Sequence, residues 1–202
     1  MNAAIPLFLF AQTPQWRLIF TVSYAVWLAF EIWVFSRDRR AARGAKRDRG
    51  SIVAIFFFIT LGIAITFTAP HYVPLARITL PSAPVFYTAM TLFWLGMALR
   101  LWAIATLGRY FRTTVLVLDD HRLVTTGPYR LLRHPAYSGG VMTLTGLGLA
   151  TGNWISALGA IVCILLAYAW RIRVEEKALQ ERFGSAFEAH RRRTWAILPF
   201  VW

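Results

Sequence analysis

Long apolar stretches alternate with short polar ones along this chain of 202 residues. A helix needs about 20 residues to cross a hydrocarbon core about 30 Å thick. Four apolar stretches approach or exceed that length: residues 17–35, 52–69, 83–106 and 136–170. The last one holds 35 positions without a charge, so we divide it at Gly152 and Asn153, residue types that favour turns. The pattern predicts an all-α fold, a polytopic transmembrane helical bundle with about five transmembrane helices.

The segment 171–193 has a different character, because charged residues alternate with apolar ones in it. Leu179, Phe183 and Phe187 recur at four-residue intervals, which is typical of one face of a helix. We expect this helix to continue out of the membrane and to be interrupted at Gly184.

Composition supports a membrane protein, since 57% of the residues are apolar and only 15% are charged, where a soluble domain carries about 25% charged residues. The net charge of +13 does not indicate nucleic-acid binding, because the basic residues lie between apolar stretches and not along one soluble face. Cys163 has no second cysteine to pair with and no ligand cluster around it, so we expect neither a disulfide nor a metal site.

The basic residues also predict how the chain is oriented. Residues 36–50 and 171–193 each contain seven Lys or Arg and residues 108–135 contain five, whereas residues 70–82 contain only Arg77. Basic loops stay on the cytoplasmic side. The N-terminus is therefore expected outside and the C-terminus in the cytoplasm, in an integral multi-pass protein that we place in the bacterial inner membrane.

The first candidate site is the run Arg133-His134-Pro135-Ala136-Tyr137 between the third and fourth predicted spans. Proline fixes its own φ and biases the residue before it away from helix, so His134 is expected in an extended or turn conformation. An arginine fork beside aromatic rings suits an anionic or aromatic ligand. The alternative is an interfacial loop with snorkelling arginines and belt aromatics.

The second candidate site lies at the cytoplasmic end of the fifth span, where Arg171, Arg173, Glu175 and Glu176 cluster. Arg171 and Glu175 lie one helical turn apart on the same face, so they either pair with each other or clamp a zwitterionic ligand. The alternative is an ordinary charged helix end that leaves the membrane.

Two further charges lie inside predicted spans. A carboxyl group in a span is costly and indicates function by default, but Glu31 is close to Ser36 and is alternatively expected to reach the interface or to pair with Arg37. Arg100 lies near the end of its span and is expected to snorkel outward.

Glycines recur in the fourth and fifth spans but follow no strand, so they do not form a nucleotide-binding loop. We expect them to permit close helix packing. They are Gly139, Gly140, Gly146, Gly148 and Gly159.

Taken together, the motif of residues 127–140 (GPYRLLRHPAYSGG) and the later double Glu resemble the isoprenylcysteine carboxyl methyltransferase family of membrane methyltransferases, which is related to the phospholipid methyltransferases. The resemblance covers roughly residues 90–202. It implies a single membrane domain, 1–202, in which residues 1–82 form a two-helix part without family signature and residues 83–202 form the methyltransferase core.

The resemblance also implies S-adenosylmethionine as cofactor, bound at the cytoplasmic ends of the last helices. The residues that match the family's cofactor pocket are Gly127, Tyr129, His134, Pro135 and Tyr137, closed by Glu175 or Glu176. Arg133 and Arg171 match arginines near the reacting groups.

Two departures from the family pattern leave the methyl acceptor open. Phe187 and His190 stand where the family tail has two tyrosines, and the run 96–98 (Gly-Met-Ala) stands where phospholipid methyltransferases have Gly-x-Gly. A carboxylate acceptor needs only alignment and desolvation, for which Arg133 or Arg171 can hold one oxygen. A protonated amine needs a base, and His134 or Glu175 is available.

We expect an amphiphilic or lipid-linked acceptor that arrives from the surrounding membrane lipids. Two other classes are open. Sterol-type membrane reductases, which use NADPH, carry a similar element that continues into Gly-Glu, whereas here residues 137–140 read Tyr-Ser-Gly-Gly. A non-enzymatic membrane scaffold would bind no cofactor.

Overall fold

The computed structural model describes residues 7–39, 50–111 and 123–199, and within these ranges the regular structure is helical. The predicted all-α fold is confirmed. The elements, with 3-10 helices written η, are η1 (Leu9–Ala11), α1 (Pro14–Arg39), α2 (Ser51–Tyr72), η2 (Pro74–Ala76), α3 (Ser82–Leu107), η3 (Gly108–Tyr110), η4 (Gly127–Arg130), α4 (Pro135–Ala150), α5 (Trp154–Phe183) and α6 (Ser185–Arg191).

The long apolar stretch divides where the sequence predicts. Gly152 adopts a φ of 77°, which glycine reaches without strain, and Asn153 caps α5 by accepting hydrogen bonds from the backbone N–H groups of Ile155 and Ser156. The predicted extension is also confirmed, because α5 continues to Phe183 and Gly184, with a φ of 52°, separates it from α6.

Four helices, α1, α2, α3 and α5, are long and apolar enough to cross a membrane. The remaining predicted span corresponds to α4, which has 16 residues. At 1.5 Å per residue this helix is about 24 Å long, shorter than the hydrocarbon core of about 30 Å. Most of its residues are buried by neighbouring helices. Five crossings and their orientation remain predictions.

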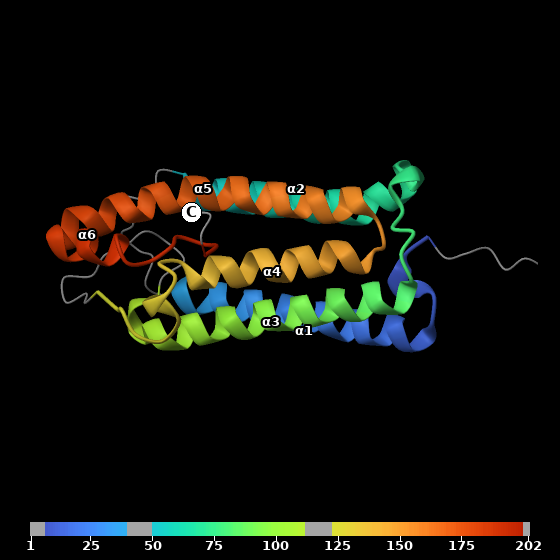
Figure 1. Cartoon of the computed structure of the whole chain (residues 1–202), viewed down its shortest axis with the longest axis horizontal. Coiled ribbons are helices and arrows are strands. Elements are labelled where there is room, and N and C mark those ends of the chain that lie inside the picture. Colours follow the sequence, from blue (N-terminus) through green and yellow to red (C-terminus); the bar gives the residue numbers. More distant parts are fainter. Residues whose placement is uncertain (1–6, 40–49, 112–122, 200–202) are drawn as a thin grey trace, which may run out of the picture.

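The helices form an elongated bundle in which α4 lies between α3 and α5, and α2 runs along α5 (Figure 1). Glycines let α3 and α4 approach closely, as predicted. A Cβ added to Gly139 would lie 2.5 Å from the backbone oxygen of Gly96, and one added to Gly146 would lie 2.5 Å from that of Ala89. Only residues without a side chain fit such contacts, so the glycines fix the spacing of the two helices.

One end of the bundle carries the end of α3, the start of α4, the extension of α5 and α6, while the 72–82 connection and the turn between α4 and α5 lie at the other end (Figure 1). The basic segments that the sequence assigns to the cytoplasm border this first end. Most of the basic residues of 36–50 lie outside the described residues, as do Arg112 and Arg122. We call the end with α6 the polar end.

Candidate active site at the polar end

The segment before α4 is built from backbone-restricted residues. Gly127 begins η4 with a φ of 57°, and Pro135 is the first residue of α4, where its missing N–H costs no helical hydrogen bond. His134 lies just outside the helix with a φ of −128°. This confirms the predicted non-helical conformation of His134, which directs the histidine toward α5.

The tail after α6 pairs with this segment, which no sequence pattern indicated. Arg133 N–H donates to the carbonyl of Trp195 (2.7 Å), and His134 N–H donates to that of Ala196 (3.0 Å). The hydroxyl of Ser138 donates to the carbonyl of Ile197 at 2.6 Å. A backbone pairing this short has no amphipathic period, so the sequence offered no signal for it.

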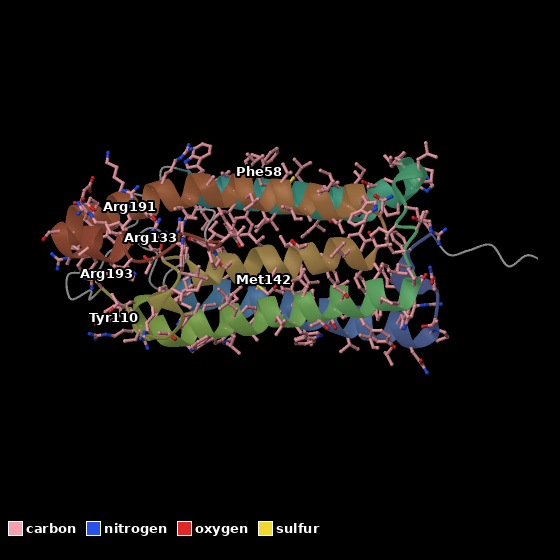
Figure 2. All side chains as sticks on the ribbon, viewed as in Figure 1. Phe58, Tyr110, Arg133, Met142, Arg191 and Arg193 are labelled. Carbon is pink, nitrogen blue, oxygen red and sulfur yellow. The ribbon has the colours of Figure 1, made fainter. Side chains whose placement is uncertain are left out.

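Glu176 of α5 binds both polar residues of the motif. Its Oε1 atom accepts from Nε of Arg133 at 2.7 Å and lies 3.2 Å from Nε2 of His134. The guanidinium of Arg133 also donates to the carbonyls of Arg191 and Thr194. Arg133 therefore ties together the loop, α5 and the tail, and its position between these segments is visible in Figure 2.

Tyr137 joins the motif to the other charges of α5. Its hydroxyl donates to Oε2 of Glu175 at 2.7 Å and accepts from Nε of Arg171 at 3.3 Å. Its ring stacks between those of His134 (centroids 5.5 Å apart) and Tyr168 (4.4 Å). The two candidate sites recognised in the sequence are thus one connected cluster.

A third charged pair lies deeper in the bundle and corrects the expectation for Arg100. Arg100 does not snorkel outward: it donates from NH2 to Glu31 at 3.0 Å and from NH1 to the carbonyl of Ala136 at 3.2 Å. Glu31 therefore pairs with Arg100 of α3, whereas the side chain of Arg37, the alternative partner, lies outside the described residues. The physical reason is that two opposite charges inside apolar spans neutralise each other.

A cavity of about 150 Å³ lies against this pair. Its polar wall is formed by Glu31, Arg100, Tyr137 and Arg171. Its other wall is largely apolar and comes mostly from α1 and α2; the residues are Val34, Phe35, Ile52, Ile55, Phe56, Ile59, Phe111 and Tyr168. The cavity thus offers charged donors at one side and hydrocarbon at the other.

Two of the residues matched to the family's cofactor pocket lie further off. A Cβ on Gly127 would lie 3.1 Å from the hydroxyl of Thr106, and the Tyr129 hydroxyl donates to the carbonyl of Ala103 at 3.5 Å, so both face α3. The pKa of Tyr129 is raised well above its usual value, first by burial and then by the negative charge of Glu175. These contacts indicate packing, and the roles of both residues in binding stay predictions.

A second hollow, of about 480 Å³, lies at the surface of the polar end between the η4 region and α6. Its lining includes Thr125, Arg130, His190 and Thr194. The pKa of His190 is lowered by partial burial and by the positive charges of Arg133 and His134. This hollow falls in the size range of ligand pockets, about 300–1,000 Å³.

The fold and the site define a multi-pass helical membrane protein with a buried polar cluster at one end of its bundle. The model of the isoprenylcysteine carboxyl methyltransferase (ICMT) family matches residues 88–181, which include both halves of the cluster. Over these residues the chain is similar to the isoprenylcysteine carboxyl methyltransferase family.

Individual relatives show the same similarity. A probable protein-S-isoprenylcysteine O-methyltransferase of Oryza sativa subsp. indica is 31% identical over 119 residues, which are 58% of this chain and 62% of the relative. Protein-S-isoprenylcysteine O-methyltransferase B of Arabidopsis thaliana is 36% identical, over 55% of this chain and 58% of the relative. The uncharacterized protein YpbQ of Bacillus subtilis is 32% identical, over 44% and 58%. The chain thus covers about three fifths of the length of these relatives.

The fold is also similar to that of the eukaryotic intramembrane Ras methyltransferase ICMT. The TM-score is 0.60 at 24% sequence identity, and the match covers 72% of this chain and 52% of that one. Glu31 lies outside the residues matched by the family model.

Proposed function

We propose that this protein is an S-adenosylmethionine-dependent methyltransferase that methylates the carboxylate of an amphiphilic acceptor at the polar end. One observation carries the proposal: Tyr137, Glu175 and Arg171 form one hydrogen-bonded group that borders a cavity with an apolar wall. The similarity of residues 88–181 to a methyltransferase family supports the reaction class.

The cavity suits a carboxylate with a hydrocarbon tail. Arg100 and Arg171 present guanidinium groups to it, and an arginine fork matches the two oxygens of a carboxylate. A carboxylate is already a nucleophile, so the site need only orient one oxygen and exclude water. The apolar side chains of α1 and α2 exclude water and accept the tail.

The residues beside the cavity also fit the donor. S-adenosylmethionine, when bound, supplies an electrophilic methyl group on a sulfonium and carries an amino acid group with both charges. Glu175, about a third exposed at its side chain, can accept from an ammonium. The surface hollow beside Thr194 offers room for the remaining part of the donor. His134, Pro135 and Glu176 would shape this side of the site.

We assign different roles to the two arginines matched to the family. Arg171 contacts the Tyr137 hydroxyl and lines the cavity, so it is the candidate for orienting the acceptor's carboxylate. Arg133 is occupied by Glu176 and by two backbone carbonyls. It is therefore a positioning residue that holds the tail against the motif.

The relatives' names suggest an acceptor of the S-isoprenylcysteine type. We propose that such a thioether-linked carboxylate, or a lipid of similar shape, enters from the surrounding membrane lipids. We also propose that the polar end faces the cytoplasm, where a soluble donor is available. We propose the bacterial inner (plasma) membrane as the location; the relatives named above are from plants and from a bacterium.

The donor is tested by calorimetric titration of the detergent-purified protein with S-adenosylmethionine and with NADPH. We expect binding of S-adenosylmethionine alone. Binding of NADPH in its place would indicate a reductase, and binding of neither would contradict both enzyme functions.

The acceptor class is tested by incubating membranes that contain the protein with radiolabelled methyl donor. Lipid and protein fractions are then separated and treated with alkali. A methyl ester releases volatile methanol under these conditions, whereas an N-methyl group does not. Label that resists alkali would exclude the carboxylate.

A further inference from the structure

Three arginines of the cluster, Arg133, Arg100 and Arg171, each have a carboxylate partner. Arg133 lies 2.7 Å from Glu176, and Arg100 lies 3.0 Å from Glu31. The third pair is looser, because Nε of Arg171 lies 3.8 Å from a Glu175 oxygen that already accepts from Tyr137. A carboxylate that approaches one of these three arginines therefore meets a guanidinium that already has a carboxylate beside it.

Two carboxylates beside one guanidinium repel each other strongly in such a place. At 4 Å and an effective dielectric constant of about 20, the energy of two like charges is about 4 kcal/mol. An incoming carboxylate must therefore replace an existing one. Of these three ion pairs, Arg100 with Glu31 is the one in which both partners line the cavity.

Glu31 is the partner that can leave. Its side chain is 32% exposed, against 13% for that of Arg100, and only four residues separate it from Ser36 at the polar end of α1. A carboxylate near a helix end can extend to the interface and become hydrated. Glu31 can thus move to water without a change in the backbone.

Arg100 stays in place when Glu31 moves. Its NH1 donates to the backbone carbonyl of Ala136 at the start of α4, a contact that does not depend on α1. Its Nε is buried and has no hydrogen-bond partner among the described residues. The guanidinium is therefore a fixed site that one carboxylate at a time can occupy.

We propose that Glu31 is a specificity-determining residue that occupies Arg100 in place of the acceptor's carboxylate, and that a carboxylate acceptor displaces it. This inference rests on the proposed function, since it concerns the acceptor of that reaction. Glu31 then lowers the affinity for every carboxylate, and only an acceptor whose tail also fills the apolar wall overcomes this competition. Weakly anchored anions are excluded.

The first test compares acid and ester binding. The probes are N-acetyl-S-farnesylcysteine and its methyl ester, titrated into the detergent-purified protein without donor. Glu31→Gln keeps the side-chain shape but removes the competing charge, so the acid should bind at least about tenfold more tightly, equivalent to about 1.4 kcal/mol. Binding of the ester should change less than about twofold, because it has no charge to compete.

The control is Glu188→Gln, which removes an exposed carboxylate of α6 paired with Arg192. It should leave both affinities unchanged. An acid that binds Glu31→Gln no more tightly than the wild type would overturn the proposal. An equal gain for the ester would do so as well, since it would indicate added space and not released charge.

A second test uses the wild type and does not depend on the folding of a variant. Glu31 is labelled with a water-soluble carbodiimide and an amine, and the modification is measured by mass spectrometry. The acid should increase labelling of Glu31 and the ester should not; unchanged labelling at saturating acid would overturn the proposal. Titration with S-adenosylmethionine is independent of both tests, so failure of the proposed function is distinguished from failure of this inference.

Discussion

Tyr137 holds the motif of residues 133–137 against the charged residues of α5. Its hydroxyl is shared between Glu175 and Arg171, and its ring is held between His134 and Tyr168. A side chain fixed by stacking and by two charged partners has little rotational freedom, which is the arrangement that aligns reacting groups without cost at the time of reaction.

Arg171 and Arg173 offer a matched pair of variants on one helix. Arg171 is buried and contacts the Tyr137 hydroxyl, whereas Arg173 is exposed. Arg171→Ala should lower methyl transfer at least about 30-fold, since loss of a buried charge partner costs about 2 kcal/mol or more. Arg173→Ala should stay within about twofold. Turnover is measured with radiolabelled donor on equal amounts of inserted protein, and equal losses would remove Arg171 from the site.

His190 predicts a pH dependence of stability. Its pKa in the folded protein is lowered by partial burial and by the positive charges of Arg133 and His134. Below its ordinary pKa of about 6.5 the unfolded chain binds a proton more readily than the folded chain, so stability is lost as the pH falls. Thermal unfolding in detergent at pH 7.5 and 5.5 should show a smaller loss for His190→Gln than for the wild type.

If His190→Gln loses as much stability as the wild type between pH 7.5 and 5.5, the loss comes from other groups. Arg130 lines the same hollow and keeps its charge over this range, so it does not alter the sign.

The sequence indicated most residues of the cluster at the polar end, but not the ion pair that lies deeper in the bundle. Proline after His134 and the spacing of Arg171 and Glu175 are local signals, and the structure joins these residues as one site. The partnership of Glu31 with Arg100 was missed, because it depends on how α1 packs against α3, and no local period encodes this. The tail pairing at Trp195 was missed for the same reason.

At the scale of elements, the glycine contacts between α3 and α4 set the position of Arg100. Gly139 faces Gly96, and an added Cβ would also come within 2.7 Å of the backbone nitrogen of Arg100. A larger residue at position 139 would therefore push α3 away from α4 and move Arg100 with it.

Gly139→Ala should test this spacing. The methyl group would overlap the α3 backbone and destabilise the protein by about 1–3 kcal/mol, typical of an overpacked core. The unfolding temperature in detergent should fall, and methyl transfer should fall with it. Ala98→Val, at an exposed position of α3, is the control and should leave both nearly unchanged. Full stability in Gly139→Ala would show that the close approach is dispensable.

Helix boundaries were predictable from apolar length and turn residues, whereas the shortness of α4 was not. A buried helix need not match the bilayer, because its neighbours face the lipid in its place. Hydropathy alone cannot distinguish a short inner helix from a full crossing.

At the scale of the whole molecule, the end of α3, the start of α4 and α6 share one end (Figure 1). The positive-inside rule assigns this end to the cytoplasm. Leu75, in η2, is 98% exposed at the opposite end, and Thr125 is exposed at the polar end.

Single-cysteine labelling can check this orientation, because the native Cys163 is buried. A membrane-impermeant maleimide applied to intact cells should label Leu75→Cys and not Thr125→Cys. Both should react after the membranes are opened. The reverse pattern in intact cells would invert the predicted topology.

The pairing of Glu31 with Arg100 also has a consequence for biogenesis. Helices enter the membrane in chain order, so α1 arrives with a carboxylate whose partner is synthesised 69 residues later. A charge at the centre of a span costs about 2.5–3.5 kcal/mol on insertion scales, and less near its end. Until α3 is inserted, α1 is held at a depth that keeps Glu31 hydrated. The ion pair between Glu31 and Arg100 therefore links the final depth of α1 in the membrane to the insertion of α3.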